Sequence, residues 1–118
     1  MANPVLQFQM LSNDPEATAK FYSALFEWSA DVKNAMGYRR LHTGSDEGIE
    51  GGIWPAPSGA PAFVQLFVGV PDMKAALDRA TALGAKVLVP PTPLPEGGQL
   101  AILQDPQGMS FGLWQRAA

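Results

Sequence analysis

The sequence predicts an α+β protein made of two tandem strand-helix-strand-strand-strand (βαβββ) modules. Two stretches alternate apolar and polar residues, each is followed by an amphipathic segment that begins at an Asp, and each half of the chain ends in Gly-aliphatic-Trp. Gln65 follows Gln7 by 58 residues (65 minus 7), and Trp114 follows Trp54 by 60 (114 minus 54). This near-constant offset indicates an internal duplication whose copies are each too small to bury a sheet face alone.

The first module is expected at about residues 5–54. Its first strand is Val5 to Leu11, where apolar and polar side chains alternate with period two. The helix that follows has Asp14 as its N-cap and Pro15 at its first position, where these residue types favour helix initiation. Three short strands, separated by turn-forming residues, are then expected at Trp28 to Val32, Tyr38 to Thr43 and Ile49 to Ile53.

The second module is expected at about residues 62–115 and opens with the alternating strand Ala62 to Val68. Asp72 is expected to cap its helix, and Gly84 is expected to end that helix as a C-terminal glycine. Residues 90–98, "PPTPLPEGG", are expected to form a Pro-rich loop. The remaining strands are expected at Lys86 to Val89, Gln99 to Leu103 and Ser110 to Trp114.

The bulk composition limits the function classes. A chain of 118 residues, 47% of them hydrophobic, has the size of one domain, so residues 1–118 are expected to form a single domain. The net charge of -3, from 8 basic and 11 acidic residues without a basic cluster, argues against a nucleic-acid partner. The sequence shows no secretion signal and no apolar run near the roughly 20 residues of a membrane helix, and it lacks Cys. We therefore expect a cytoplasmic protein with no membrane partner.

Four segments in order carry a resemblance to a known superfamily: "QFQMLSNDPEATAKFYSALFEW", "GGIW", "VPDMKAALDRATALGAKV" and "LQDPQGMSFGLWQ". They resemble the vicinal oxygen chelate superfamily, which includes glyoxalase I (lactoylglutathione lyase), the bleomycin resistance proteins and the extradiol dioxygenases. The resemblance covers about Val5 to Gln115. It implies paired βαβββ modules whose mixed sheet curves into a half-barrel around a cavity, commonly within dimers, so a homodimer is expected.

Catalytic members of that superfamily usually hold a divalent metal in the cavity. Carried over residue by residue, the resemblance puts the first-strand ligands at Gln7 and Gln65 and the last-strand ligands at Gly52 and Gly112. Both expected carboxylates are absent, and neutral amides with glycines do little to offset the charge of a divalent metal. We therefore expect no metal and no cofactor. For the two glutamines, hydrogen-bonding groups of a cavity and solvated residues on an exposed sheet face remain alternatives.

Strand alternation divides the side chains between two sheet faces. Leu6, Phe8, Met10, Val64, Leu66, Val68, Phe111 and Leu113 are expected to face the helices. The aromatic and amide groups on the other face suit a flat, largely uncharged ligand, and a glycine beneath each Trp leaves room for it. The alternative is that the two tryptophans fill the cleft or a dimer interface. The expected ligand-binding residues are Gln7, Gln9, Gln65, Phe67, Trp54, Trp114, Tyr38, Arg40 and His42.

The only histidine, His42, shares strand parity with Tyr38 and Arg40. The sequence fixes no carboxylate partner near it, which favours a surface or packing role over acid–base chemistry. The acidic run of Asp46, Glu47 and Glu50 has the spacing of a solvated turn. No catalytic residue is assigned.

Three functions follow from these residues. The preferred one is a metal-free protein, similar to the bleomycin resistance type, that binds a small aromatic or amphiphilic ligand in the cavity. The alternatives are a glyoxalase- or dioxygenase-like enzyme (lyase, isomerase or oxidoreductase) with an unconventional or absent metal site, and a structural module that only dimerises. Fold alone does not decide among them, and the sequence does not identify the ligand.

Overall fold

The computed structural model describes residues 2–31, 38–56, 59, 61–94 and 97–116. The chain divides into two compact units, which are described separately below. The N-unit is Gln7–Gln65, and the C-unit combines Met1–Leu6 with Leu66–Ala118. The prediction that residues 1–118 form one domain stays a prediction.

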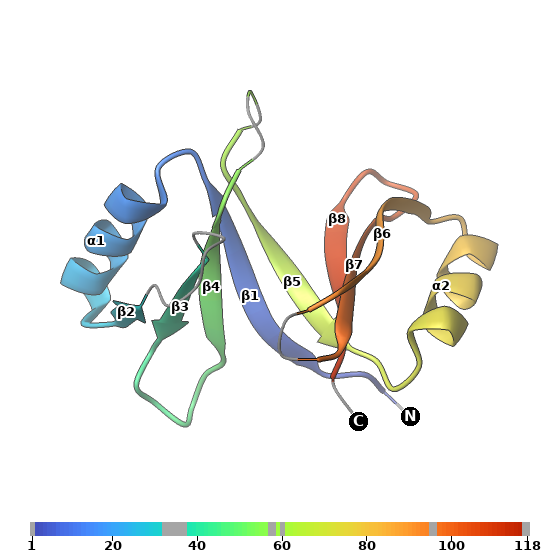
Figure 1. The fold of residues 1–118 in the computed structure, drawn as a ribbon, viewed down its shortest axis with the longest axis horizontal. Coiled ribbons are helices and arrows are strands. Elements are labelled where there is room, and N and C mark those ends of the chain that lie inside the picture. The colour runs from blue at the N-terminus through green and yellow to red at the C-terminus, as the bar shows by residue number, and fades with distance from the viewer. Residues whose placement is uncertain (1, 32–37, 57–58, 60, 95–96, 117–118) are drawn as a thin grey trace. The chain divides into compact units, whose positions relative to one another are not determined.

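The N-unit has one helix and a four-stranded mixed sheet (Figure 1). The strand order is β2-β3-β4-β1, with β1 and β4 parallel and the other neighbours antiparallel. A parallel neighbour requires a long crossover, and the helix together with β2 and β3 supplies it. The elements are β1 (Val5–Ser12), α1 (Pro15–Phe26), β2 (Ser29–Asp31), β3 (Arg39–His42) and β4 (Glu50–Pro55).

The C-unit repeats this plan with the strand order β5-β8-β7-β6. Strands β5 and β8 are parallel, and the other neighbours are antiparallel. The βαβββ order predicted for each half is therefore confirmed, and the protein is α+β. The elements are β5 (Phe63–Gly69), α2 (Met73–Ala82), β6 (Lys86–Pro93), β7 (Gln99–Gln104) and β8 (Ser110–Gln115).

The helix boundaries are set by local chemistry, as predicted. Asp14 Oδ1 accepts from the Ala17 backbone N–H at 3.1 Å, and Asp72 Oδ1 accepts from the Ala75 N–H at 3.1 Å. Each carboxylate satisfies a first-turn donor that has no partner within the helix. After α2, Gly84 has a φ of 101°, a conformation that suits glycine at a helix end.

Each unit has its own apolar core between its helix and its sheet. Ala19, Leu41 and Ile53 form the N-unit core, against which Phe8 and Met10 pack. In the C-unit, Met73 of α2 packs with strand residues of the same unit. The C-unit core consists of Val70, Met73, Ala101, Leu103 and Leu113, with Val68 and Phe111 packed against it.

Three residues expected to face a helix do otherwise. Val64 and Leu66 are exposed, because α2 packs against β6 and β8. Leu6 lies against Gly69, where an added Cβ would be only 2.5 Å from its Cδ1 atom. Strand alternation therefore predicted the helix-facing side correctly at most positions. It failed at the positions that the helix does not cover.

The prediction of a Pro-rich loop after Val89 is wrong in its first half. Strand β6 continues to Pro93, with register irregularities between Val87 and Thr92. Proline lacks a backbone donor, so it is tolerated on a strand with a neighbour on one side only, and β6 pairs in this unit with β7 alone. Neither helix among the described residues is long and apolar enough to cross a membrane.

Candidate functional site

The N-unit sheet has a face that α1 does not cover, here called the N-face. Phe8 and Met10 point toward the helix, so Gln7 and Gln9 point to the N-face. Gln9 is buried at 4% exposure, and its Nε2 donates to Gln7 Oε1 at 2.5 Å and, at 3.5 Å, to the Tyr38 hydroxyl. Gln9 Oε1 is also buried, and it accepts no hydrogen bond from the described residues. The N-face thus contains hydrogen-bonded amides, one of which is buried and has an acceptor without a partner among the described residues.

Tyr38 and Trp54 form the aromatic part of the N-face. Their ring centroids are 4.5 Å apart at an interplanar angle of 32°. The Tyr38 ring also covers Gly52, where an added Cβ would be 2.2 Å from its Cε1 and hydroxyl atoms. The expectation that Gly52 leaves room for a ligand is therefore wrong, because Tyr38 already occupies that space.

The corresponding face of the C-unit sheet, here called the C-face, repeats this arrangement. Phe67 and Gly112 are directly paired across β5 and β8, and an added Cβ at Gly112 would be 2.4 Å from the Phe67 ring. Trp114 is half-buried on the same face, with Leu100 as its neighbour on β7. Gln65, the last residue of the N-unit, lies on β5 and is buried at 4% exposure. Here too the space over the glycine is filled by a ring.

These contacts test whether the residues could hold a divalent metal. Gly52 and Gly112 offer no side-chain donor, and aromatic rings cover both positions. Gln7 and Gln65 contribute only neutral amides. The described residues contain no group of three or more His, Asp or Glu that could bind a metal ion. The residues at the superfamily's four ligand positions do not fit a metal centre.

His42 has carboxylate partners that the sequence did not reveal. Its Nε2 is 2.9 Å from Asp31 Oδ2, and its Nδ1 is 3.3 Å from Glu50 Oε2. Hydrogen bonds to Asp31 and then to Glu50 raise the pKa of His42 above its ordinary value of 6.5. The expectation of no carboxylate partner is corrected, since β2 and β4 flank β3 in the sheet.

The acidic run divides between two environments. Glu50 begins β4 and contacts His42, whereas Asp46 and Glu47 lie in an exposed turn as predicted. Arg40 lies on β3 with the same strand parity as His42, and it is exposed. The N-face therefore combines the amide network, the aromatic pair and a His held by two carboxylates. Asp31 is the residue that sequence reasoning missed entirely, because its contact with His42 depends on the pairing of β2 with β3.

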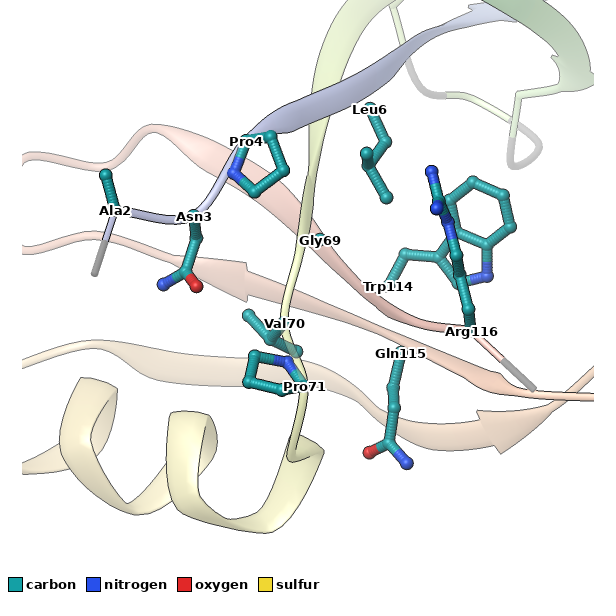
Figure 2. A pocket seen from close by; sticks show the side chains of 10 residues that line it. All are labelled: Ala2, Asn3, Pro4, Leu6, Gly69, Val70, Pro71, Trp114, Gln115 and Arg116. Atoms are coloured by element: carbon teal, nitrogen blue, oxygen red, sulfur yellow. The ribbon is translucent and has the colours of Figure 1, made fainter. Parts of the chain in front are cut away.

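A pocket of about 620 Å³ lies within the C-unit (Figure 2). Among the residues predicted for the site, only Trp114 lines it. Its other walls come from the start of β1 with the residues before it, and from the ends of β5 and β8 with the residues after them. The full lining is Ala2, Asn3, Pro4, Leu6, Gly69, Val70, Pro71, Trp114, Gln115 and Arg116.

The sequence matches the family described as "Glyoxalase-like domain" over residues 7–114. A Mycobacterium bovis protein with a provisional glyoxylase name is 31% identical over 111 residues, which cover 88% of this chain and 42% of that protein. An anthracycline biosynthesis protein of Streptomyces peucetius is 27% identical over 125 residues, covering 92% of this chain and 46% of the relative. The chain thus spans less than half the length of these curated relatives.

Solved structures share the fold at low sequence identity. A hypothetical protein from Bacillus halodurans matches with a TM-score of 0.72 at 12% identity, over 100% of this chain and 97% of the other. The methylmalonyl-CoA epimerase of Streptomyces coelicolor matches with a TM-score of 0.65 at 19% identity, over 97% of each chain. At these identities the likeness concerns the fold alone.

Proposed function

Because this chain belongs to the glyoxalase-like domain family, we propose that it is a metal-free member that binds a small, flat aromatic or amphiphilic ligand. The observation that carries the proposal is the Tyr38–Trp54 pair beside the buried Gln9 amide. An aromatic pair provides a stacking surface, and an amide acceptor without a partner favours a ligand that brings a donor. Few polar groups on a mostly apolar surface are typical of small-molecule sites.

The rings over Gly52 and Gly112 support the metal-free part of the proposal. They put the Tyr38 phenol ring over Gly52 and the Phe67 ring over Gly112, which are two of the four positions where the superfamily's resemblance places metal ligands. The relative from Streptomyces peucetius is named for the biosynthesis of anthracyclines, which are planar aromatic molecules. That name supports a planar ligand class for this chain, without identifying the compound.

The test is a binding screen with planar aromatic compounds, followed by substitution of a ligand-facing tryptophan. Trp54→Phe keeps a smaller ring and so loses only part of a stacking energy of about 0.5–1.5 kcal/mol, and it should weaken binding about twofold to threefold. Trp28→Phe is the matched control, since Trp28 packs with Phe8 and Phe26 on the helix side. The proposal fails if no compound binds, or if the two substitutions have the same effect.

The contact of His42 with Asp31 and Glu50 favours one second candidate, an enzyme that uses acid–base chemistry without a metal. Both ring nitrogens face carboxylates, whose hydrogen bonds raise the pKa of His42, and in this candidate the half-exposed Glu50 accepts a proton from the substrate. Glu50→Gln should then abolish turnover while leaving ligand affinity nearly unchanged. If the wild type shows no turnover and Glu50→Gln binds the ligand as the wild type does, the enzyme candidate is rejected and binding remains the function.

Homodimerisation and a cytoplasmic location also belong to the proposal. Phe21, Leu25 and Phe26 of α1 are exposed at 59%, 57% and 51%, more apolar surface than a helix in solvent usually presents. A symmetric partner would cover such a surface. Sedimentation at tens of micromolar should give a dimer, and a monomer at that concentration would contradict this part. The absence of Cys is compatible with a reducing compartment.

A further inference from the structure

The geometry points to a second, separate site: the C-unit pocket binds a small organic carboxylate with an apolar body, and Arg116 recognises the carboxylate. This site does not depend on the N-face or on the proposed function. It rests on the shape of the pocket, on its fixed walls and on the single charge that its lining carries.

The pocket walls are fixed by hydrogen bonds to separate segments of the C-unit. The Gly69 N–H donates to the Pro4 carbonyl at 2.8 Å, and the Val70 N–H donates to the Trp114 carbonyl at 2.9 Å. Gln115 Oε1 accepts from the Met73 N–H at 2.6 Å, which ties the end of β8 to the start of α2. A site whose walls are already held in place loses less conformational freedom when a ligand binds.

The lining is mostly apolar, with Asn3, Gln115 and Arg116 as its polar side chains. Leu6 lies against Gly69, and Pro4, Val70, Pro71 and the Trp114 indole supply further apolar surface. The pocket's volume of about 620 Å³ is within the range of small-molecule sites. An aromatic or branched aliphatic body therefore fits this surface better than a sugar or a polar peptide.

Arg116 gives the pocket its charge preference. Its guanidinium carbon lies 5.7 Å from the centre of the Trp114 ring, and Figure 2 shows the two side chains next to each other. Among the described residues that line the pocket, none is Asp or Glu and Arg116 alone is charged, in a chain whose net charge is -3. Guanidinium binds carboxylates through paired, charge-assisted hydrogen bonds.

Trp114 Nε1 adds a second donor at the same place. This indole nitrogen is buried, and among the described residues it has no hydrogen-bond partner. A buried donor without a partner is costly, and an anion bound between Trp114 and Arg116 would supply one. An indole donor and a guanidinium on neighbouring residues, beside an apolar wall, match a carboxylate attached to a flat apolar group.

The experiment compares naphthalene-1-carboxylate with its neutral isostere, naphthalene-1-carboxamide, by isothermal titration calorimetry at neutral pH. The carboxylate is expected to bind at least about tenfold more tightly, the size expected of one charge-assisted interaction at a partly exposed site. Raising sodium chloride to about 0.5 M should reduce this preference, because salt screens exposed charges. Equal affinity for the two compounds, or no binding of either, would overturn the proposal.

Two substitutions assign the effect to the pocket. Arg116→Gln should remove the preference for the carboxylate and leave the carboxamide affinity unchanged. Arg79→Gln is the matched control, because Arg79 is an exposed arginine of the same unit outside the lining, and it should preserve the preference. Trp114→Phe keeps a ring but removes the Nε1 donor, and it should weaken the carboxylate more than the carboxamide. If Arg116→Gln and Arg79→Gln behave alike, the preference is a general charge effect and the proposed site is wrong.

These outcomes are separable from those of the proposed function. Trp54→Phe tests the N-face, whereas Arg116→Gln tests a pocket whose lining contains no N-face residue. If the wild type does not prefer the carboxylate but Trp54→Phe weakens the binding of planar compounds, only this second site is rejected. If the wild type prefers the carboxylate but Trp54→Phe does not weaken the binding of planar compounds, only the proposed N-face function is rejected.

Discussion

The two units share one plan but differ in the chemistry of the sheet face that the helix leaves uncovered. In both, a ring covers a glycine of the last strand: Tyr38 covers Gly52, and Phe67 covers Gly112. The N-face adds amides, a His and two carboxylates, whereas the C-face adds mainly apolar side chains beside Trp114. The two units therefore share the packing of a ring over a glycine but differ in their polar groups, and the contacts of His42 with carboxylates lie in the N-unit.

The largest expected losses of stability come from truncating one buried leucine in the core of each unit. Leu41 and Leu103 are both completely buried, one in each unit. Leu41→Ala and Leu103→Ala should each lower the free energy of unfolding by about 2–5 kcal/mol, measured by urea denaturation. If the chain is one domain, each variant shifts a single transition. Leu83→Ala, at a residue 72% exposed, should have almost no effect.

Two separate transitions in either core variant would contradict the single-domain prediction. In that case the units would unfold independently, and the two units would have to be compared as two domains.

The glycines under the rings should be the next most sensitive positions. Gly52→Ala and Gly112→Ala would each place a Cβ within 2.4 Å of an aromatic ring, so each should cost about 1–3 kcal/mol through overpacking. Gly48→Ala is the control, because an added Cβ there meets nothing within 4 Å. Thermal unfolding measures all three. If Gly52→Ala lowers the stability no more than Gly48→Ala does, the Tyr38 ring does not cover Gly52, and the geometry of the N-face site is wrong.

The helix caps should give smaller and comparable losses. Asp14→Ala and Asp72→Ala each remove a carboxylate that accepts a first-turn N–H at 3.1 Å, so each should cost about 0.5–2 kcal/mol. Asp46→Ala, in an exposed turn, removes the same charge without a cap. Chemical denaturation of the three variants compares the effects. A cap variant no weaker than Asp46→Ala would show that the helix of that unit is held by packing alone.

The smallest effect is a pH dependence confined to the N-unit. His42 is the chain's only histidine, and Asp31 and then Glu50 raise its pKa above 6.5. A raised folded-state pKa means that the stabilisation is fully present below 6.5 and is lost as the pH rises through the folded-state pKa. Asp31→Asn should lower the pKa more than Glu50→Gln, as followed by the NMR titration of the single imidazole. A His42 pKa at or below 6.5 in the wild type would contradict the contacts of His42.

The parts of the fold that depend on nearby residues could be predicted from the sequence. Alternation along β1 and β5 and the caps at Asp14 and Asp72 are local patterns, and the structure confirms them. The continuation of β6 through Pro93 was missed because tolerance of proline depends on which strand lies at the edge of a sheet. That position follows from strand order, which no local pattern specifies.

The site was predicted less completely for a similar reason. Gln9, Tyr38 and Trp54 could be assigned to one face by parity and by the repeat, and in the structure Tyr38 contacts both of the others. The filling of the space over Gly52 could not be foreseen, since it depends on how the Tyr38 ring packs against β4, which no local pattern specifies. Arg116 follows the last predicted strand, where no periodic pattern exists to mark it as part of a pocket.

The central claim, ligand binding by the N-face without a metal, is tested most directly by the indole N–H resonances in NMR. A planar aromatic compound that binds should shift the signal of Trp54 and leave that of Trp28 in place, because Trp28 packs on the helix side. The shift should be the same with EDTA and with added zinc, nickel or manganese. A shift that appears only with a metal, or a Trp28 signal that moves as far as that of Trp54, would contradict the account.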